Sequence, residues 1–277
     1  MGTSVTKAPV GAGEPGATEG TPHVGRRVWR VVGATFAAVT LACGVLNAVT
    51  WLARQSETQT QTYRQPVSRI VLDLDTGDLT VTPSGDDTVT VQRHLRWTLA
   101  KPTIEETWDG GTLRIRVRCA QFQFAINSLC GVDYVLQVPK GVDVEAHSDT
   151  GDTTVRDVEG SLRLTTDTGD IDVSNTPGTL WVRTDTGDVR ASGLASSEVD
   201  VATDTGDVVL RFTRPPSRVQ VATDTGDVSV AVPRGDAYRV QTSTDIGSKN
   251  IRILQDVTAS RTIIARTDVG DVDLFYS

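Results

Sequence analysis

Asp185-Thr186-Gly187-Asp188 is one of six identical tetrapeptides in this chain of 277 residues. The other five begin at Asp75, Asp149, Asp167, Asp204 and Asp224, and altered copies begin at Asp245 and Asp268. From Asp149 onward, the first aspartates are 18, 18, 19, 20, 21 and 23 residues apart. A nearly constant period of this length indicates stacked copies of one small structural unit.

Apolar residues alternate with other residues on both sides of each tetrapeptide. Around Asp185, they are Leu180 and Val182 before it, and Val189 and Ala191 after it. A period of two is typical of a strand with one buried face. The buried positions change parity across the tetrapeptide, so the chain must turn there. Glycine and aspartate suit such a turn, because glycine adopts positive φ and aspartate accepts hydrogen bonds from nearby amides.

We therefore predict an all-β fold, a β-solenoid with two short strands in each repeat of about 18–23 residues. Its regular repeats cover residues 143–277. A meander of hairpins folded into a sandwich is the alternative, and the handedness of the solenoid stays open. Because Ile246 and Val269 replace the threonine in the altered copies, we expect that threonine to point inward. We also expect Phe275 and Tyr276 to close the last coil.

The segment before the repeats predicts a membrane anchor. Residues 1–30 are expected to be a disordered cytoplasmic tail, and residues 31–53, which contain no charge, one transmembrane helix. The arginines that precede it predict a cytoplasmic N-terminus, with Trp29 and Trp51 at the two interfaces. Residues 54–66 are interpreted as a polar stalk. A cleaved signal peptide and lipidation at Cys43 are the alternatives.

The remainder of the chain is acidic. The whole chain has 35 acidic and 27 basic residues; two of the acidic and five of the basic residues precede residue 55, so the rest carries a net charge of −11. This charge argues against nucleic acid and anionic lipid headgroups as partners. Residues 67–142 are interpreted as a first coil with an inserted strand and hairpin cap. Cys119 and Cys130 within it are expected to form a disulfide outside the cytoplasm, with a metal-binding pair as the alternative.

The repeated aspartates allow one chemical interpretation. Stacked coils would align the two carboxylates of each corner into ladders, and calcium between the coils would relieve their repulsion. The candidate ligands are Asp149, Asp152, Asp167, Asp170, Asp185, Asp188, Asp204, Asp207, Asp224 and Asp227. In the alternative, each aspartate accepts hydrogen bonds from backbone amides, and no cofactor is needed.

Two catalytic interpretations are disfavoured, and we predict that the protein is not an enzyme. Asp-Thr-Gly also surrounds the catalytic aspartate of aspartic proteases, but those enzymes pair two such loops, whereas this chain repeats the motif at every corner. Ser148, His147 and Asp149 are adjacent, yet neighbouring strand residues point to opposite faces and cannot form a triad.

The chain resembles the bacterial "putative adhesin" family of unknown function, which is built of β-strand repeats. The resemblance rests on the repeated aspartate and glycine turns behind an apolar segment, and on Tyr134, Leu136, Val138, Pro139 and Gly141 in a Tyr-x-Leu-x-Val-Pro-x-Gly pattern. It covers about residues 68–276. It implies a solenoid at the cell surface and supplies no catalytic residue.

We accordingly expect a single-pass membrane protein with an extracytoplasmic solenoid that acts as an adhesin-like protein or an envelope scaffold or sensor. Its partner would be an envelope protein or another cell-surface component. The competing function is binding or cleavage of a glycan, because β-helices often act on polysaccharides. Trp181 would then be the platform for a sugar, although a tryptophan half-covered by a neighbouring arginine is the simpler interpretation.

Overall fold

The computed structural model describes residues 24–52, 54–98, 100–119 and 130–277. The chain divides into two compact units, Met1–Leu52 and Ala53–Ser277. The first unit contains helix α1 (Val24–Leu52). The second consists of two β-sheets, so the predicted all-β solenoid is confirmed for this unit.

The prediction of a transmembrane helix over residues 31–53 is wrong. Of the helical residues described, none form a helix that is both long enough and apolar enough to cross a membrane. Helix α1 is long, but glycine, alanine and threonine make up much of its sequence, and these residues contribute little apolar surface. From Val24 onward, the residues of the predicted tail belong to helix α1. Residues 1–23 and the side chain of Trp51 lie outside the described part.

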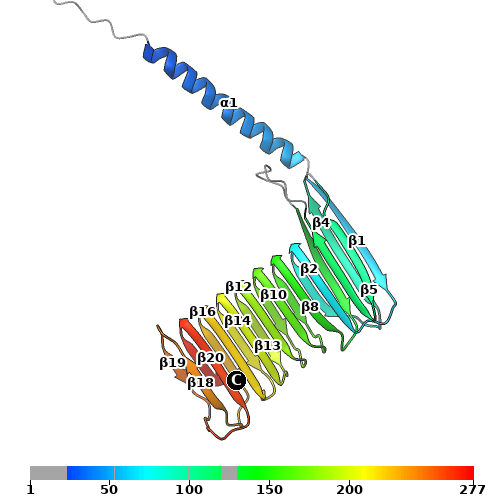
Figure 1. The fold of residues 1–277 in the computed structure, drawn as a ribbon, viewed down its shortest axis with the longest axis vertical. Coiled ribbons are helices and arrows are strands. Elements are labelled where there is room, and N and C mark those ends of the chain that lie inside the picture. Colours follow the sequence, from blue (N-terminus) through cyan, green and yellow to red (C-terminus); the bar gives the residue numbers. More distant parts are fainter. Residues whose placement is uncertain (1–23, 53, 99, 120–129) are drawn as a thin grey trace, which may run out of the picture. The chain divides into compact units, whose positions relative to one another are not determined.

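The two sheets carry the two strands of each repeat (Figure 1). The order in the first sheet, which has 11 strands, is β1 (Gln55–Tyr63), β4 (Val89–Trp97), β7 (Cys130–Val138), β3 (Leu79–Pro83), β9 (Thr153–Arg156), β11 (Ile171–Ser174), β13 (Val189–Leu194), β15 (Val208–Phe212), β17 (Val228–Val232), β21 (Val272–Tyr276) and β19 (Lys249–Ile251). The order in the second, which has 10 strands, is β18 (Arg239–Ser243), β20 (Thr262–Val269), β16 (Arg218–Thr225), β14 (Glu198–Thr205), β12 (Leu180–Thr186), β10 (Leu162–Thr168), β8 (Asp143–Thr150), β2 (Arg69–Thr76), β6 (Thr112–Arg118) and β5 (Thr103–Asp109).

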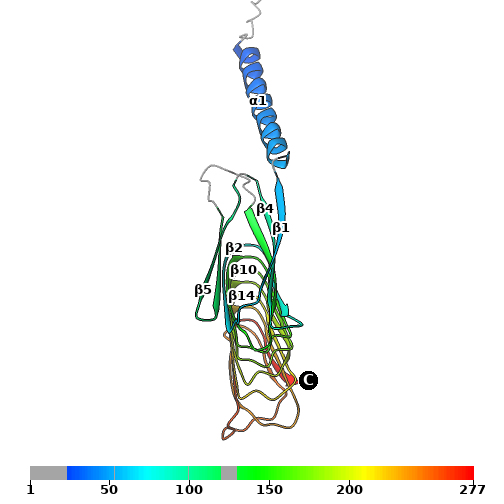
Figure 2. The same cartoon turned by 90° about the vertical axis from the view of Figure 1, so that its right-hand side faces the viewer.

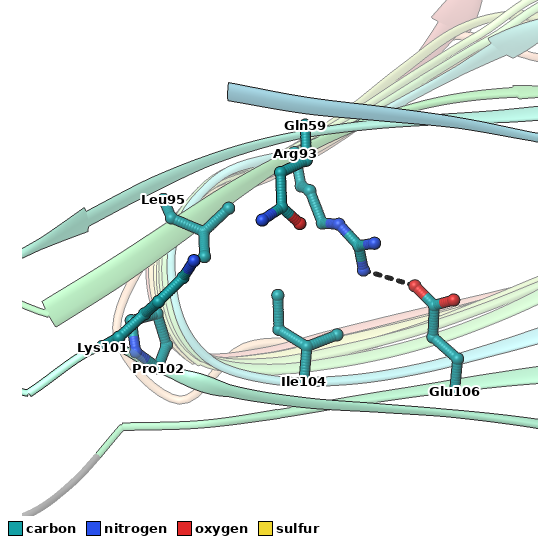
Figure 3. A pocket seen from close by; sticks show the side chains of 7 residues that line it. All are labelled: Gln59, Arg93, Leu95, Lys101, Pro102, Ile104 and Glu106. Atoms are coloured by element: carbon teal, nitrogen blue, oxygen red, sulfur yellow. Dashed lines mark hydrogen bonds and ion pairs between the residues drawn. The ribbon is translucent and has the colours of Figure 1, made fainter. Parts of the chain in front are cut away.

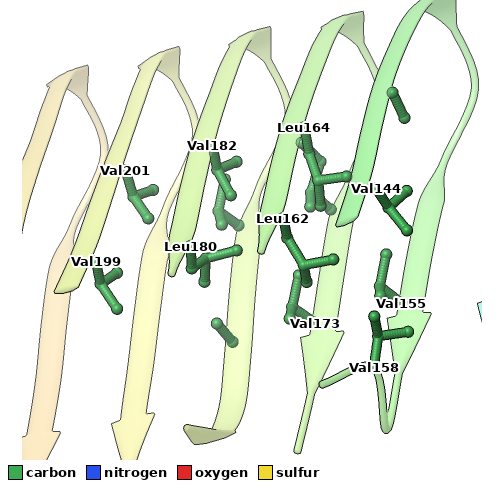
Figure 4. Packing of buried hydrophobic residues seen from close by; sticks show 14 of the residues in the cluster. Val144, Val155, Val158, Leu162, Leu164, Val173, Leu180, Val182, Val199 and Val201 are labelled. Atoms are coloured by element: carbon green, nitrogen blue, oxygen red, sulfur yellow. The ribbon is translucent and has the colours of Figure 1, made fainter. Parts of the chain in front are cut away.

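Neighbouring repeats pair in parallel and in register. Leu162 in β10 lies beside Leu180 in β12, which lies beside Val199 in β14. The side chains between the sheets therefore form rows of like residues, which Figure 4 shows for the rows through Leu162 and Leu164. Both rows are buried. Because like residues lie at the same position in successive coils, each coil buries the apolar side chains of the next. The hydrophobic core is therefore shared along the stack.

The threonine of the corner does not point inward as predicted. Its equivalents Ile246 and Val269 are 68% and 44% exposed. The inward position belongs instead to the residue before the first aspartate, which is a buried serine or threonine in most copies: Ser148, Thr166, Thr184, Thr203, Thr223 and Thr267. Buried and exposed side chains therefore alternate along the first strand of each repeat up to the corner. The corner threonine faces outward, and its replacement by isoleucine or valine retains a β-branched side chain suited to extended backbone.

The polar stalk predicted for residues 54–66 is also wrong over most of its length. Residues Gln55–Tyr63 form strand β1, which pairs antiparallel with β4 along all nine residues. The segment lacks an apolar face, but its alternating threonines favour extended backbone, and pairing with β4 satisfies one edge of the strand.

The order of coils along the stack differs from the order in the chain at both ends. At one end, β6 and β7 lie outside the first coil, because β6 pairs with β2 and β7 pairs with β3. At the other end, β18 and β19 are outermost, and β20 and β21 lie between them and β16 and β17. Phe275 and Tyr276 therefore do not close the last coil. The outermost coil has Thr242 where the other coils have mostly apolar residues, so it is suited to an exposed end.

Glycine at the corner is required by close approach as well as by φ. Gly187 has a φ of 150°, and a Cβ added to it would lie 2.0 Å from the carbonyl oxygen of Gly169 in the preceding coil. Corner carbonyls and glycines are stacked in this way from Gly77 to Gly270. A side chain at this position would push two coils apart.

We expect Gly187→Ala to lower the free energy of unfolding by about 3 kcal/mol, from backbone strain and the clash with the Gly169 carbonyl. Chemical denaturation of the full chain measures this change. Gly85→Ala is the matched control, because no atom lies within 4 Å of a Cβ there. Equal stability of the two variants would contradict the close-packed corner.

Candidate functional site

The second aspartate of each corner binds the backbone of the next coil. The Oδ1 atom of Asp152 accepts a hydrogen bond from the amide of Asp170, at 2.9 Å, and Asp170 does the same for Asp188, at 2.8 Å. The ladder contains eight such bonds of 2.7–3.3 Å, and its members are Asp133, Asp78, Asp152, Asp170, Asp188, Asp207, Asp227, Asp271 and Ser248.

This side-chain ladder replaces a backbone bond that the corner cannot make. The amides of Gly169 and Ile171 point forward and reach the carbonyls of Thr186 and Asp188 in the next coil. The amide of Asp170, between them, points backward to the preceding coil. Its acceptor there is the Asp152 carboxylate, so every backbone amide from Gly169 to Ile171 is hydrogen-bonded.

The two ends of the ladder explain two sequence features. Asp133, just before Tyr134, takes the aspartate position in the extra coil that β6 and β7 form, and accepts from the amide of Asp78 at 3.3 Å. The sequence did not predict Asp133 as a corner aspartate, because the tetrapeptide is absent there. The only signal is that Tyr134 follows Asp133 as Leu79 follows Asp78. Ser248, in the outermost coil, donates its amide to Asp271 at 2.7 Å. No coil follows it among the described residues, so loss of the carboxylate has no consequence.

From Asp149 onward, the first aspartates of the corners form a separate row that is exposed. Within the described part of the chain, the side chains of Asp167, Asp185, Asp204 and Asp224 accept no hydrogen bond and form no ion pair. Asp149 lies 3.3 Å from Nε2 of His147. Parallel strands are about 4.8 Å apart, so the row presents one carboxylate per coil along an edge of the solenoid.

Calcium binding at the corners stays a prediction. Across the ranges that the structure describes, no three acidic, histidine or cysteine side chains gather as a possible metal site. The inner carboxylates already serve backbone amides, which is the alternative that the sequence allowed. Arg190 further neutralises two of them, Asp188 at 2.6 Å and Asp170 at 3.7 Å.

The adjacent Ser148, His147 and Asp149 do not form a triad. Ser148 is buried between the sheets, whereas His147 points outward toward Asp149. The hydroxyl and the imidazole thus lie on opposite faces of β8, as strand geometry requires.

Trp181 lies on the outer face of β12 under two arginines. The guanidinium carbons of Arg163 and Arg183 lie 3.9 Å and 4.5 Å from the centre of its ring. Arg183 is held by Asp200 at 2.9 Å. Cation–π contacts of this kind favour a covered ring, so a sugar would have to displace a guanidinium to stack on Trp181.

Cys119 and Cys130 form the predicted disulfide. It joins the end of β6 to the start of β7, where the other coils have the tetrapeptide corner. The disulfide closes this corner covalently, and the amide of Cys119 donates to Asp75 at 2.8 Å, which joins the corner to the first coil.

A polar mouth opens between the sheets at the same end of the solenoid. The mouth is a pocket of about 290 Å³ lined by Gln59, Arg93, Leu95, Lys101, Pro102, Ile104 and Glu106 (Figure 3). Arg93 is only 9% exposed and pairs with Glu106. Glu106 also accepts from the hydroxyl of Tyr63, and Arg93 donates to Gln61 at 3.0 Å. A larger hollow of about 570 Å³ has Ser56, Trp97 and Cys130 among its lining residues.

Burial at this cluster shifts the pKa of two tyrosines. Burial raises the pKa of Tyr134 to about 12, and burial together with the hydrogen bond to Glu106 raises that of Tyr63 further. Both phenols therefore stay neutral in any ordinary medium. The Arg93–Glu106 pair is the only ion pair of the described residues with both side chains less than a fifth exposed.

These features define the class of the protein: a β-solenoid with aspartate and glycine corners, closed at one end by a disulfide-linked cap. The chain belongs to the Toastrack family, DUF4097, which matches residues 67–277. No curated protein matches the chain significantly.

Solved structures that are similar to this chain include proteins from Bacteroides fragilis and Clostridium sporogenes. A "putative adhesin" from Bacteroides fragilis is 14% identical, covers 80% of this chain and 97% of its own, and has a TM-score of 0.47. A cell adhesion protein, also named as putative, from Clostridium sporogenes is 10% identical over 80% of this chain and 100% of its own, with a TM-score of 0.39. At these identities and TM-scores, neither structure bears on the fold or the function of this chain.

Removing the Asp188 carboxylate should weaken one step of the inner ladder. We expect Asp188→Ala to lower the free energy of unfolding by about 1–2 kcal/mol, because the amide of Asp207 loses its acceptor. Asp188→Asn keeps a carbonyl acceptor and should cost less. Asp185→Ala, in the exposed row, is the matched control and should have little effect. Equal losses at residues 185 and 188 would contradict the ladder.

The same carboxylate gives the stability an acid dependence. The amide of Asp207, followed by Arg190, lowers the pKa of Asp188 from its ordinary value of 3.8. Its contribution is therefore present above pH 3.8 and is lost as the pH falls through the lower pKa of the folded state. Urea denaturation between pH 2 and 6 should show a smaller acid loss in Asp188→Asn than in the native chain; parallel curves would exclude this role.

Glu106→Gln should lower the free energy of unfolding by about 3 kcal/mol, because it leaves the buried charge of Arg93 without its partner. Replacing both residues, as Arg93→Met with Glu106→Leu, should cost less than the single change. Glu57→Gln removes the exposed partner of Lys101 in the same mouth and should change the stability little. Thermal and urea unfolding of the variants measure these differences; a double variant as unstable as Glu106→Gln is the contrary result.

Proposed function

We propose that the protein is a non-enzymatic, adhesin-like protein that works outside the cytoplasm and binds an envelope protein or another cell-surface component. The observation that carries the proposal is that the two aspartates of each corner have different roles. The inner row is committed to backbone amides, whereas Asp167, Asp185, Asp204 and Asp224 are exposed and free of partners in the described structure. An evenly spaced carboxylate row on a rigid frame fits a partner with a basic surface.

The location outside the cytoplasm is supported by the Cys119–Cys130 disulfide, because such bonds persist in oxidising compartments. The absence of an enzymatic role is consistent with the opposed directions of Ser148 and His147. A scaffold or a sensor of envelope stress would use the same contact with a partner, without a reaction of its own.

Retention of envelope proteins by the full chain tests this function. The variant Asp167→Asn, Asp185→Asn, Asp204→Asn should retain the bound protein at least about tenfold less well than the native chain, because three charges of the row are lost. The matched control is Asp87→Asn, Asp172→Asn, Glu198→Gln, which removes three exposed charges elsewhere. Equal retention by both variants would overturn the role of the row.

The glycan-binding alternative has its own outcome in the same experiment. If the native chain retains only envelope glycans, and Trp181→Ala abolishes that retention, the proposed protein partner is wrong and Trp181 is the sugar platform. Calcium and a chelator in parallel samples test the corner metal: retention that requires calcium would mean that the carboxylate row acts through the ion.

A further inference from the structure

We propose that strand β1 is a self-association edge, and that two copies of this chain join by antiparallel pairing of β1 with β1 of the second copy. This goes beyond the proposed function, because it concerns a surface that no other feature of the protein uses. β1 ends the first sheet, as β5 ends the second (Figure 2). No other strand of the described residues covers its outer edge.

β1 lacks most of the devices that normally protect a sheet edge, and its one inward charge, Glu57, is paired with Lys101. Free strand edges in soluble proteins are short, carry lysine or proline, or are interrupted by bulges. β1 is nine residues long, pairs with β4 without a register shift, and contains neither proline nor a basic residue. The strands that end the other edges are shorter and charged: β5 has seven residues with three acids, β18 has five with Arg239, and β19 has three with Lys249.

The sequence of β1 is complementary to itself. In the fully overlapped antiparallel register, centred on Gln59, Ser56 faces Thr62 of the second copy and Thr58 faces Thr60. The single charge of the strand, Glu57, faces Gln61, and it is already paired with Lys101 at 2.6 Å. Threonine and serine pairs across strands are favourable, and no like charges are opposed within the strand.

Charge opposes self-association more strongly at the corner edge than at β1. The corner edge carries the exposed aspartate row, so two copies would repel one another there. Only Arg54 and Arg64, both exposed, lie just beyond the two ends of β1 and would approach each other across the pair. Added salt should therefore strengthen the association by screening them.

Pairing would also bring the two polar mouths together. The first sheet has three strands beyond β3, whereas the second has only two beyond β2. β1 nevertheless lies over β5, because the hydroxyl of Tyr63 donates to Glu106 and the Tyr63 ring lies 5.3 Å from that of Trp108. A second β1 would continue the first sheet across the pair, with one polar mouth on each side of the joint.

Molar mass as a function of concentration, by light scattering of the full chain, tests the proposal. The native chain of 29.6 kDa should form a dimer. Ser56→Lys with Thr62→Lys places lysines opposite one another twice and should raise the dimer dissociation constant at least about tenfold. Mixing this variant with Ser56→Glu, Thr62→Glu should restore the dimer. Thr168→Lys with Thr186→Lys, on exposed corner positions, is the control and should leave it unchanged.

A disulfide test fixes the register. In a Cys43→Ser background, chains with Ser56→Cys and chains with Thr62→Cys should link on mixing and not separately, because opposed Cα atoms in an antiparallel pair are about 5 Å apart. A native chain that is monomeric at all concentrations overturns the proposal. So does a dimer that the β1 lysines do not affect, because α1 or another surface would then hold it. A complex of β1 with a foreign peptide, seen by mass, also excludes the second copy as occupant.

Discussion

The hydrogen bond from each inner corner aspartate to the backbone amide of the next coil is the constraint on which the other features depend. At the corner the backbone cannot continue its own ladder, and the carboxylate of Asp152 or Asp170 provides the missing acceptor. The glycine beside it lets the coils approach until a Cβ would touch the preceding carbonyl. Because the corner sets the spacing, the rows of valine and leucine between the sheets meet at contact distance, and the core is continuous from coil to coil.

The same hydrogen bond distinguishes the structural aspartate of each corner from the exposed one. An aspartate that accepts a hydrogen bond from a backbone amide is no longer available to a ligand, whereas the aspartate three residues earlier makes no such bond and faces solvent. One short motif thus supplies both the joint between coils and an exposed acidic edge. The proposed binding function uses the second of these and leaves the first intact, so the surface can be altered at moderate cost to the fold.

Both ends of the solenoid depart from the regular repeat, for reasons of exposure. At one end, Asp133 and the Cys119–Cys130 bridge replace the tetrapeptide corner, and the core gives way to the buried Arg93–Glu106 pair. At the other, a coil with Thr242 and Ser248 in place of the usual residues is outermost, and the last coil of the chain is held between two others. The strand edges there are short, whereas β1 is long and uncharged at its centre; this difference underlies the proposed self-association.

The period, the alternation and the corner composition determined the solenoid by themselves, because each depends only on local geometry and on repetition. The disulfide followed from two isolated cysteines. Sequence alone placed neither the inner aspartates' partners nor the coil order, since both depend on contacts between coils that are distant in the chain. It assigned residues 55–63 to a stalk because a strand without an apolar face is recognisable only beside its partner, β4. The sequence also led to a wrong prediction for α1, because a long uncharged segment was taken for a membrane span although it is not apolar enough. The alternation of the strand predicted that Trp181 faces outward. Only the tertiary structure showed that two guanidinium groups lie over its ring.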